Sequence, residues 1–189
     1  MRGDYYRAML VAENLVKHIT KFVLKGLKHG DFYFSQISDL GNLERIIKRK
    51  FPKIAFDDAV KLLEDNGYNK LIEHRKFGKI LTSRAENMIT KLVSDNKLPV
   101  WVTNYDRDVV AFYQKPDPKD NMKVLNADLL VPPLAKSGFG GEILGLGQRQ
   151  NKPGDILESM RRQHIKDTGR YDWYIKLRRN HKYKTTSGF

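Results

Sequence analysis

The stretch that decides the fold of this chain runs from residue 126 to residue 149. It reads NADLLV (126–131), then a connector rich in proline and glycine, then GGEILGLGQR (140–149). Both strand-like segments are apolar, and each carries one acid, Asp128 in the first and Glu142 in the second. Two such strands side by side can present both carboxylates on one face of a sheet. We therefore expect the wall of an active site here.

The glycines of the second segment bear on where its side chains point. In a regular strand the side chains alternate between two faces, so Glu142 lies opposite Gly145, Gly147 and Arg149. A glycine inside a strand often marks a bulge, or a place where a ligand or another backbone comes close. A bulge in this segment would bring Glu142 and Arg149 to the same face.

The two acids and the arginine suit a metal–phosphate site beside an anion site. Mg²⁺ typically takes one or two carboxylates together with substrate phosphate oxygens, and Asp128 and Glu142 can supply the carboxylates. The planar guanidinium of Arg149 suits a substrate carboxylate or amide oxygen. The alternative is ordinary β-structure, in which acids at strand ends and glycine-rich strand pairs are common.

Five segments, in a fixed order, go beyond this local chemistry. They are PVWVTNYDRDVVAFY (99–113), DLLVP (128–132), GEI (141–143) followed by Arg149, YDWYIKLRR (171–179) and TSGF (186–189). Together they resemble the C-terminal part of the catalytic domain of the asparaginyl-tRNA synthetases. The resemblance covers about residues 50 to 189 in register, and the set of matches is much more specific than any one of them.

The resemblance implies an α+β fold, a partial class II synthetase core in which an antiparallel sheet is flanked by helices. It also implies activation of an amino acid, asparagine or one like aspartate, with ATP. Carried over residue by residue, Asp128 and Glu142 hold the Mg²⁺ that accompanies ATP, and Arg149 contacts the amino acid as the catalytic residue. The expected amino-acid pocket comprises Gly145, Gly147, Gln148 and Arg149. A tRNA is a further expected partner.

This chain departs from the family pattern in three ways. Where the family has Gly-Gly-Ser before its Gln-Arg pair, this chain has Gly145-Leu-Gly147, which changes the pocket wall and leaves asparagine specificity open. The connector between the two acidic strands is longer. The first two family motifs are absent, and the chain stops at Phe189, where the third begins. We therefore expect negligible adenylate formation by residues 1–189 alone, with the missing motifs supplied by a homodimer, a partner chain or the flanks of a longer protein.

Length and composition favour one domain over residues 1–189, with 1–97 mainly helical and 98–189 holding the sheet and the C-terminal helices. The 35 Lys and Arg against 22 Asp and Glu leave a net charge of +13, which favours RNA and nucleotides as partners. The absence of cysteine excludes disulfides and thiolate metal sites. No apolar run is long enough to span a membrane, so we expect a cytoplasmic protein with no membrane partner.

Hydrophobic periodicity predicts helices in the first half of the chain. They are expected from Asp4, as N-cap, to Lys28; around 43–47; from Asp57 or Asp58, as N-cap, to Gly67; and from Ser83 through Val93, where Ser83 and Glu86 form a capping box. Residues 68–80 are expected to form a loop. Residues 100–105 and 109–114 have the aromatic and β-branched content of two paired strands.

The C-terminal part is strongly basic, with eleven Lys or Arg against four acids in residues 145–189. Tyr171, Trp173, Tyr174 and Tyr183 lie among these charges. Such aromatics either stack on nucleic-acid bases or are buried against the rest of the fold.

Two classes of function remain open. The first is an ATP-dependent ligase, which includes a relative that makes free asparagine or another amide. The second is a non-catalytic, synthetase-derived module that binds RNA or a protein partner. Substitution of Asp128 and Glu142 separates the two, because it abolishes Mg-ATP binding under the first and leaves partner binding intact under the second.

Overall fold

The computed structural model describes residues 4–29, 40–133, 140–181 and 187–188 of the chain. The helices are α1 (Tyr5–Lys28), α2 (Leu40–Lys48), α3 (Phe56–Asp65), α4 (Ser83–Ser94), α5 (Pro153–Arg162) and α6 (Asp172–His181), with short 3-10 turns η2 (Asn69–Leu71) and η3 (Gly169–Tyr171). The strands are β1 (Lys53–Ala55), β2 (Ile72–Arg75), β3 (Gly78–Leu81), β4 (Val100–Thr103), β5 (Asn126–Val131), β6 (Gly141–Gln148) and β7 (Ser187–Gly188).

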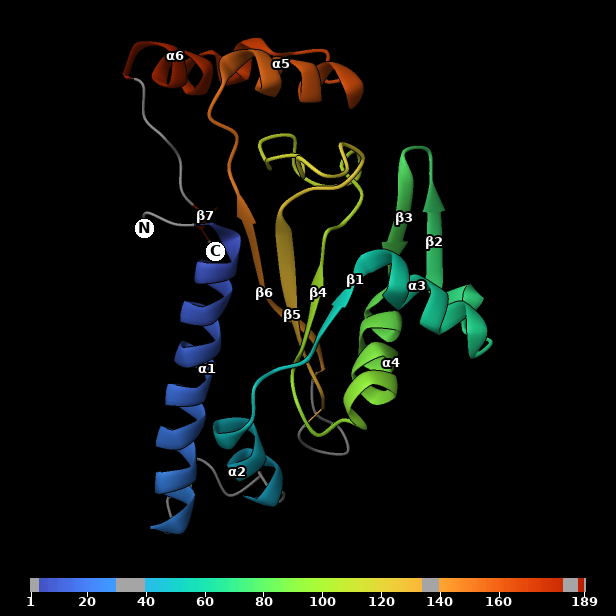
Figure 1. Cartoon of the computed structure of the whole chain (residues 1–189), viewed down its shortest axis with the longest axis vertical. Helices are drawn as coiled ribbons and strands as arrows, with labels where there is room; N and C mark the ends of the chain where they lie inside the picture. The colour runs from blue at the N-terminus through green and yellow to red at the C-terminus, as the bar shows by residue number, and fades with distance from the viewer. Residues whose placement is uncertain (1–3, 30–39, 134–139, 182–186, 189) are drawn as a thin grey trace.

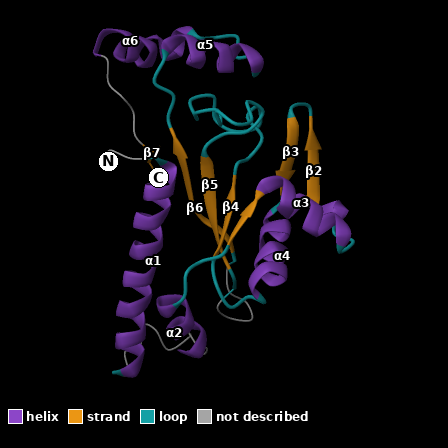
Figure 2. Cartoon of the chain, in the orientation of Figure 1, coloured by secondary structure: helices purple, strands orange, loops and turns teal. Residues whose placement is uncertain are grey.

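Five strands form the main sheet in the order β1–β4–β5–β6–β7 (Figure 1). Strand β1 runs parallel to β4, and the other neighbouring pairs are antiparallel. Strands β2 and β3 form a separate antiparallel hairpin beside α3 and α4 (Figure 2). The predicted α+β class, an antiparallel sheet flanked by helices, is confirmed.

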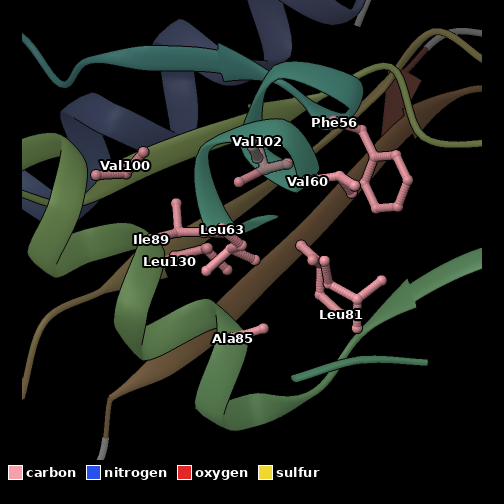
Figure 3. Packing of buried hydrophobic residues seen from close by; sticks show 11 residues of the cluster. Phe56, Val60, Leu63, Leu81, Ala85, Ile89, Val100, Val102 and Leu130 are labelled. Carbon is pink, nitrogen blue, oxygen red and sulfur yellow. The ribbon is translucent and has the colours of Figure 1, made fainter. Parts of the chain in front are cut away.

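The central strands β4 and β5 are mostly apolar because helices cover both faces of the sheet; Asn126 and Asp128 are the polar exceptions in β5. Val100, Val102 and Leu130 face α3 and α4 in one hydrophobic core (Figure 3). Trp101 and Leu129 face α1 and α2 in the other. All five side chains are fully buried, and each contributes about 1.5–3 kcal/mol by leaving water. These two cores hold β4 and β5 in place and so position Asp128.

Helices α5 and α6 form a third layer near one end of the sheet (Figure 1). Ile156 of α5 and Ile175 of α6 are buried together with Phe112 of the loop between β4 and β5. Arg162 donates two hydrogen bonds to the carboxylate of Asp108 in the same loop, at 2.9 and 2.5 Å, a bidentate geometry that also aligns the helix.

The predicted pairing of residues 100–105 with residues 109–114 is wrong. Strand β4 pairs instead with β1 and β5, and residues 105–125 form turns tied by isolated bridges such as Pro116 with Val124. Asn104 has a φ of 60°, in the left-handed region, which turns the chain out of the strand direction. The aromatic content of 109–114 serves the third core layer instead of a ladder.

The predicted loop over residues 68–80 is also wrong, since this segment holds η2 and the β2–β3 hairpin. Exposed polar residues such as His74 and Arg75 hide the strand pattern. Only Ile72 and Leu81 are buried in the hairpin, where they join the core of α3 and α4.

Of the predicted ends of α1 and α3, two are confirmed and one is not. Asp4 caps α1 as predicted, because its Oδ1 accepts a backbone N–H of the first turn at 3.1 Å. Ala55, not Asp57 or Asp58, is the N-cap of α3; the two acids lie in the first turn, where negative charge favours the helix dipole. Gly67 follows α3 with a φ of 79°, as predicted for a helix stop.

Candidate active site

A β-bulge in strand β6 decides which side chains share a face. Leu129 pairs with Leu144, but the next residue, Leu130, pairs with Glu142, so Ile143 is an extra residue without a partner in β5. The extra residue reverses the alternation and puts Glu142 on the same face as the two glycines that follow. The predicted bulge is therefore present, at Ile143 instead of at a glycine.

Gly145 lies beneath both predicted metal ligands. It is the cross-strand partner of Asp128. A Cβ atom at this position would lie 2.7 Å from Glu142 Oε1 and 3.1 Å from Asp128 Oδ1. The two carboxylates therefore converge over one backbone position, and a side chain there would displace them.

Glu86 of α4 brings a third acid to this place. Its Oε2 accepts a hydrogen bond from the backbone N–H of Glu142 at 3.0 Å. The preceding Gly141 has a φ of 112°, and a Cβ atom there would lie 2.7 Å from the same oxygen, so glycine is what permits this approach. The predicted capping box is wrong, because the Thr82 hydroxyl caps α4 by accepting the N–H of Ala85.

A cavity of about 270 Å³ opens beside these acids. Its lining residues are Lys79, Ile80, Leu81, Glu86, Tyr105, Val109, Val110, Asp128 and Glu142. The Tyr105 hydroxyl and the Asp128 carboxylate form a hydrogen bond. Lys79, the one cation among these described lining residues, pairs with Glu64 of α3 at 3.1 Å. The negative charge in the cavity is therefore not matched by a cation of its own.

The electrostatics of the three acids favour a bound cation. Burial, followed by the negative charge of Glu142, raises the pKa of Asp128 to about 7, against an opposing effect of the Tyr105 hydrogen bond. Burial also raises the pKa of Glu86 above its usual range. Burial, and then the charge of Asp128, raise the pKa of Tyr105. A divalent cation at this place would stabilise the ionised carboxylates and reverse these shifts for the acids.

Arg149 lies just beyond β6. Its backbone forms an isolated bridge with Gln114, and its guanidinium lies 4.5 Å from the centroid of the Tyr113 ring. The structure thus brings Asp128 and Glu142 together, whereas Arg149 is not among the described residues that line the cavity around them.

The two other predicted pocket residues lie between the acids and Arg149. A Cβ atom at Gly147 would lie 3.1 Å from Gln114 Cδ and 3.2 Å from Gln114 Oε1, so the Gln114 side chain covers this glycine. Within the described part of the chain, Gln114 Oε1 is buried and has no hydrogen-bond partner. Gln148 pairs with Ser187 of β7, and strand alternation puts its side chain on the face opposite Gly147.

Comparison with known families now adds to this geometry. The family model described as tRNA synthetases class II (D, K and N) matches residues 2–189. The chain belongs to the class II tRNA synthetases. The asparagine–tRNA ligase of Clostridium perfringens (strain 13 / Type A) is 34% identical over 181 residues, a match that covers 94% of this chain and 36% of that ligase. The synthetase chain thus spans about a third of the length of such relatives.

Solved structures of class II synthetases share the fold of this chain. The asparaginyl-tRNA synthetase of Pyrococcus horikoshii, solved with asparaginyl-adenylate, has a TM-score of 0.77 and 30% identity over 95% of this chain and 37% of that one. The aspartyl-tRNA synthetase of Entamoeba histolytica has a TM-score of 0.69 and covers 99% of this chain and 36% of its own, but at 17% identity it shows the fold alone. The resemblance found in the sequence is confirmed at the level of the family.

The donor set of this synthetase chain fits Mg²⁺. Within the described ranges, no three or more His, Cys, Asp or Glu side chains are grouped to hold a metal by themselves. Mg²⁺ does not need such a cage, since it usually keeps several waters and takes one or two carboxylates together with substrate phosphates. Asp128 and Glu142, converging over Gly145, are such a pair.

Sequence reasoning missed three residues of this candidate site. Glu86 was assigned to a helix cap because Ser-x-x-Glu fits a capping box equally well. Tyr105 was placed in a strand pair on its aromatic character. Gln114 had no signal at all, because nothing local indicates that it covers Gly147.

None of the helices in the described residues is both long and apolar enough to cross a membrane.

Proposed function

We propose that this chain carries the metal-binding and amino-acid-binding part of a site that activates an amino acid with ATP, as in the asparaginyl-tRNA synthetases. The observation that carries the proposal is that Asp128 and Glu142 converge over Gly145 at the edge of a cavity. Among the described residues that line this cavity, the one cation, Lys79, is already paired with Glu64. The names of the relatives support asparagine as the amino acid and tRNA as a ligand of the whole protein, and the asparaginyl-adenylate of one solved relative fits ATP as the co-substrate.

In the proposed reaction a carboxylate oxygen of the amino acid bonds to the α-phosphorus of ATP, and the bond from that phosphorus to the pyrophosphate leaving group breaks. Bound Mg²⁺ would neutralise phosphate charge during this transfer. Asp128 and Glu142 would hold the ion. Glu86 positions Glu142 through the backbone N–H, and Tyr105 orients the carboxylate of Asp128. Such positioning lowers the barrier of the reaction, because the reacting groups are already oriented when they meet.

The amino-acid side of the proposed site comprises Gly145, Gly147, Gln148 and Arg149. Arg149 offers a guanidinium for the side-chain oxygen of the amino acid, because a planar fork of donors suits a carboxylate or an amide. Gly147 stands where the family pattern has serine, and Gln114 covers it. We therefore propose that the identity of the amino acid depends on Gln114 together with Arg149.

Calorimetric titration with Mg-ATP tests the metal site in the full 189-residue chain. The double substitution Asp128→Asn, Glu142→Gln is expected to weaken Mg-ATP binding by at least roughly tenfold, as loss of a metal ligand does. The matched control is Asp65→Asn, Glu73→Gln, which removes two exposed carboxylates that are not among the residues lining the cavity. Equal affinity of the two double variants would overturn the proposal.

Pyrophosphate exchange tests how much of the reaction these residues can support. Residues 1–189 alone are expected to show negligible exchange with any amino acid, because the segments that grip the α-phosphate in the family are not among them. Robust exchange would contradict this expectation. An assay for free asparagine or another amide, run in parallel, tests the related amide-synthesis activity.

The net charge of +13 favours a second candidate, a non-catalytic module that binds RNA or a protein partner. Under this candidate the Asp128→Asn, Glu142→Gln variant keeps its partner binding unchanged, and neither variant nor parent binds Mg-ATP.

A further inference from the structure

We propose that the exposed side of α6, with the turn η3 before it, is an RNA-binding surface on which Trp173 stacks against an unpaired base. We call this the α6 surface and define it by Arg170, Trp173, Lys176 and Arg179. The proposal rests on the RNA binding named under the proposed function and assigns it to a surface; its test uses no ATP, so it succeeds or fails separately from amino-acid activation.

The exposure of Trp173 separates it from the other aromatics of the basic C-terminal part. Tyr171 and Tyr174 are partly buried and pack against the cluster that contains Ile175, and Tyr183 lies outside the described residues. Trp173 lies 66% exposed on the outer side of the same helix. A large aromatic ring left in water keeps its apolar faces available to a stacking partner.

Cations flank Trp173 at the spacing that places side chains beside one another on a helix. Arg170 lies three residues before it, Lys176 three after, and Arg179 three further on. All three are exposed. Within the described ranges Lys176 and Arg179 form no ion pair, and Arg170 has only an exposed pair with Asp167 at 2.8 Å. Exposed pairs of this kind contribute little and yield readily to a phosphate.

These features fit RNA with unpaired nucleotides better than a membrane. The exposed neighbours of Trp173 on α6 are Asp172, Lys176, Arg179 and Asn180, so the apolar area is one ring within a polar, mainly basic helix face. A membrane-bound helix needs several apolar side chains on one face. A single ring among unpaired cations suits a base stacked between phosphate contacts, and an unpaired base is required because a duplex hides the faces of its bases.

The chain contains a built-in reporter for this contact. It has two tryptophans, of which Trp101 is fully buried in the sheet core and Trp173 is exposed. Stacking of a base on Trp173 quenches its emission, while a purely electrostatic contact elsewhere leaves that emission unchanged. Tryptophan fluorescence and fluorescence anisotropy of a labelled RNA therefore report stacking and binding separately.

The experiment titrates the full 189-residue chain into two fluorescein-labelled RNA hairpins with equal phosphate numbers, one with a single-stranded 3′ overhang and one blunt. We expect tighter binding and tryptophan quenching with the overhang hairpin. Trp173→Ala should weaken binding of that hairpin by roughly tenfold and abolish the quenching. Lys176→Ala, Arg179→Ala should reduce the slope of log K against log salt by roughly 1.4, for two lost phosphate contacts.

Matched controls come from α1, which carries an equally exposed aromatic and exposed lysines. Phe22 is 67% exposed, so Phe22→Ala removes the same kind of ring, and Lys21→Ala, Lys25→Ala removes two charges. Both controls should leave overhang binding and the salt slope nearly unchanged. Three outcomes would each overturn the proposal. The first is binding of the overhang hairpin without tryptophan quenching, and the second is an equal loss of RNA affinity in the α1 controls. The third is a preference for anionic phosphatidylserine vesicles over the overhang hairpin.

Discussion

The backbone N–H of Glu142 donates a hydrogen bond of 3.0 Å to Oε2 of Glu86, across 56 residues of sequence. Helix α4 thereby holds the start of the bulged strand, and the bulge in turn brings Glu142 to the face of Asp128. The proposed metal site thus depends on a contact between a helix and a strand that no local pattern specifies.

Asp128 should make the stability of the chain depend on pH. Its pKa is about 7 in the folded chain, above its ordinary value, so between about pH 4 and pH 7 the folded state holds a proton that the unfolded state releases. The free energy of unfolding therefore falls as pH rises through this window. Asp128→Asn should flatten that dependence and raise the free energy of unfolding at pH 8 by about 1–3 kcal/mol. Urea unfolding at pH 5 to 8 measures both.

The control for the pH series is Asp65→Asn, which neutralises an exposed carboxylate at the end of α3. It should leave the slope as it is in the parent chain. An Asp128→Asn variant whose unfolding free energy still falls by the same amount between pH 5 and pH 8 would show that Asp128 is not the group responsible.

Gly145→Ala should separate the metal site from the stability of the fold. The new methyl group meets the ends of two flexible carboxylates, Glu142 and Asp128, so they can move aside and unfolding free energy should change by less than about 1 kcal/mol. The moved carboxylates no longer converge, and Mg-ATP affinity should fall by roughly tenfold. Gly154→Ala is the control, since nothing lies within 4 Å of a Cβ atom there. Unchanged affinity in Gly145→Ala would contradict the proposed ligand pair.

Gly141→Ala should destabilise the chain by about 2–3 kcal/mol, because its φ of 112° is unfavourable for alanine and its Cβ would meet Glu86 Oε2 at 2.7 Å. Gly67→Ala has a φ of 79° but open space around it, so it should cost only about 1–2 kcal/mol. Chemical denaturation of both variants gives the comparison. If the contact with Glu86 contributes to the loss, Glu86→Ala should restore part of the unfolding free energy lost in Gly141→Ala. The same substitution should restore none of the unfolding free energy lost in Gly67→Ala.

Gly147→Ser introduces the residue that the family pattern has at this position, against the side chain of Gln114. Because a Cβ atom there would lie 3.1 Å from Gln114 Cδ, we expect the substitution to cost about 1 kcal/mol in the parent chain and close to zero when combined with Gln114→Ala. A double-mutant cycle by urea unfolding measures the coupling. Gly188→Ser, with open space at its Cβ, is the control. Additive effects would show that Gln114 does not cover Gly147.

Several elements of the fold were predictable because their signals are local. Apolar periodicity located α1, and the side chain of Asp4 caps it within its own first turn. Aromatic and β-branched content identified β4, and an apolar segment that carries one acid identified β5. The β2–β3 hairpin escaped prediction because only Ile72 and Leu81 are buried in it, and two residues do not make a pattern.

The sequence by itself determined the family, the apolar central strands and the two acids on neighbouring strands, because each follows from residue types at short spacing. Tertiary structure decided that β4 pairs with β1 and β5, that Ile143 is the bulged residue, and that Glu86 and Tyr105 join Asp128 at one cavity. It also decided that Trp173 is exposed while Tyr171 and Tyr174 are partly buried against the cluster of Phe112 and Ile175. The physical reason is that register, bulge position and burial depend on which distant segments pack together, and that choice minimises the free energy of the whole chain instead of any short stretch.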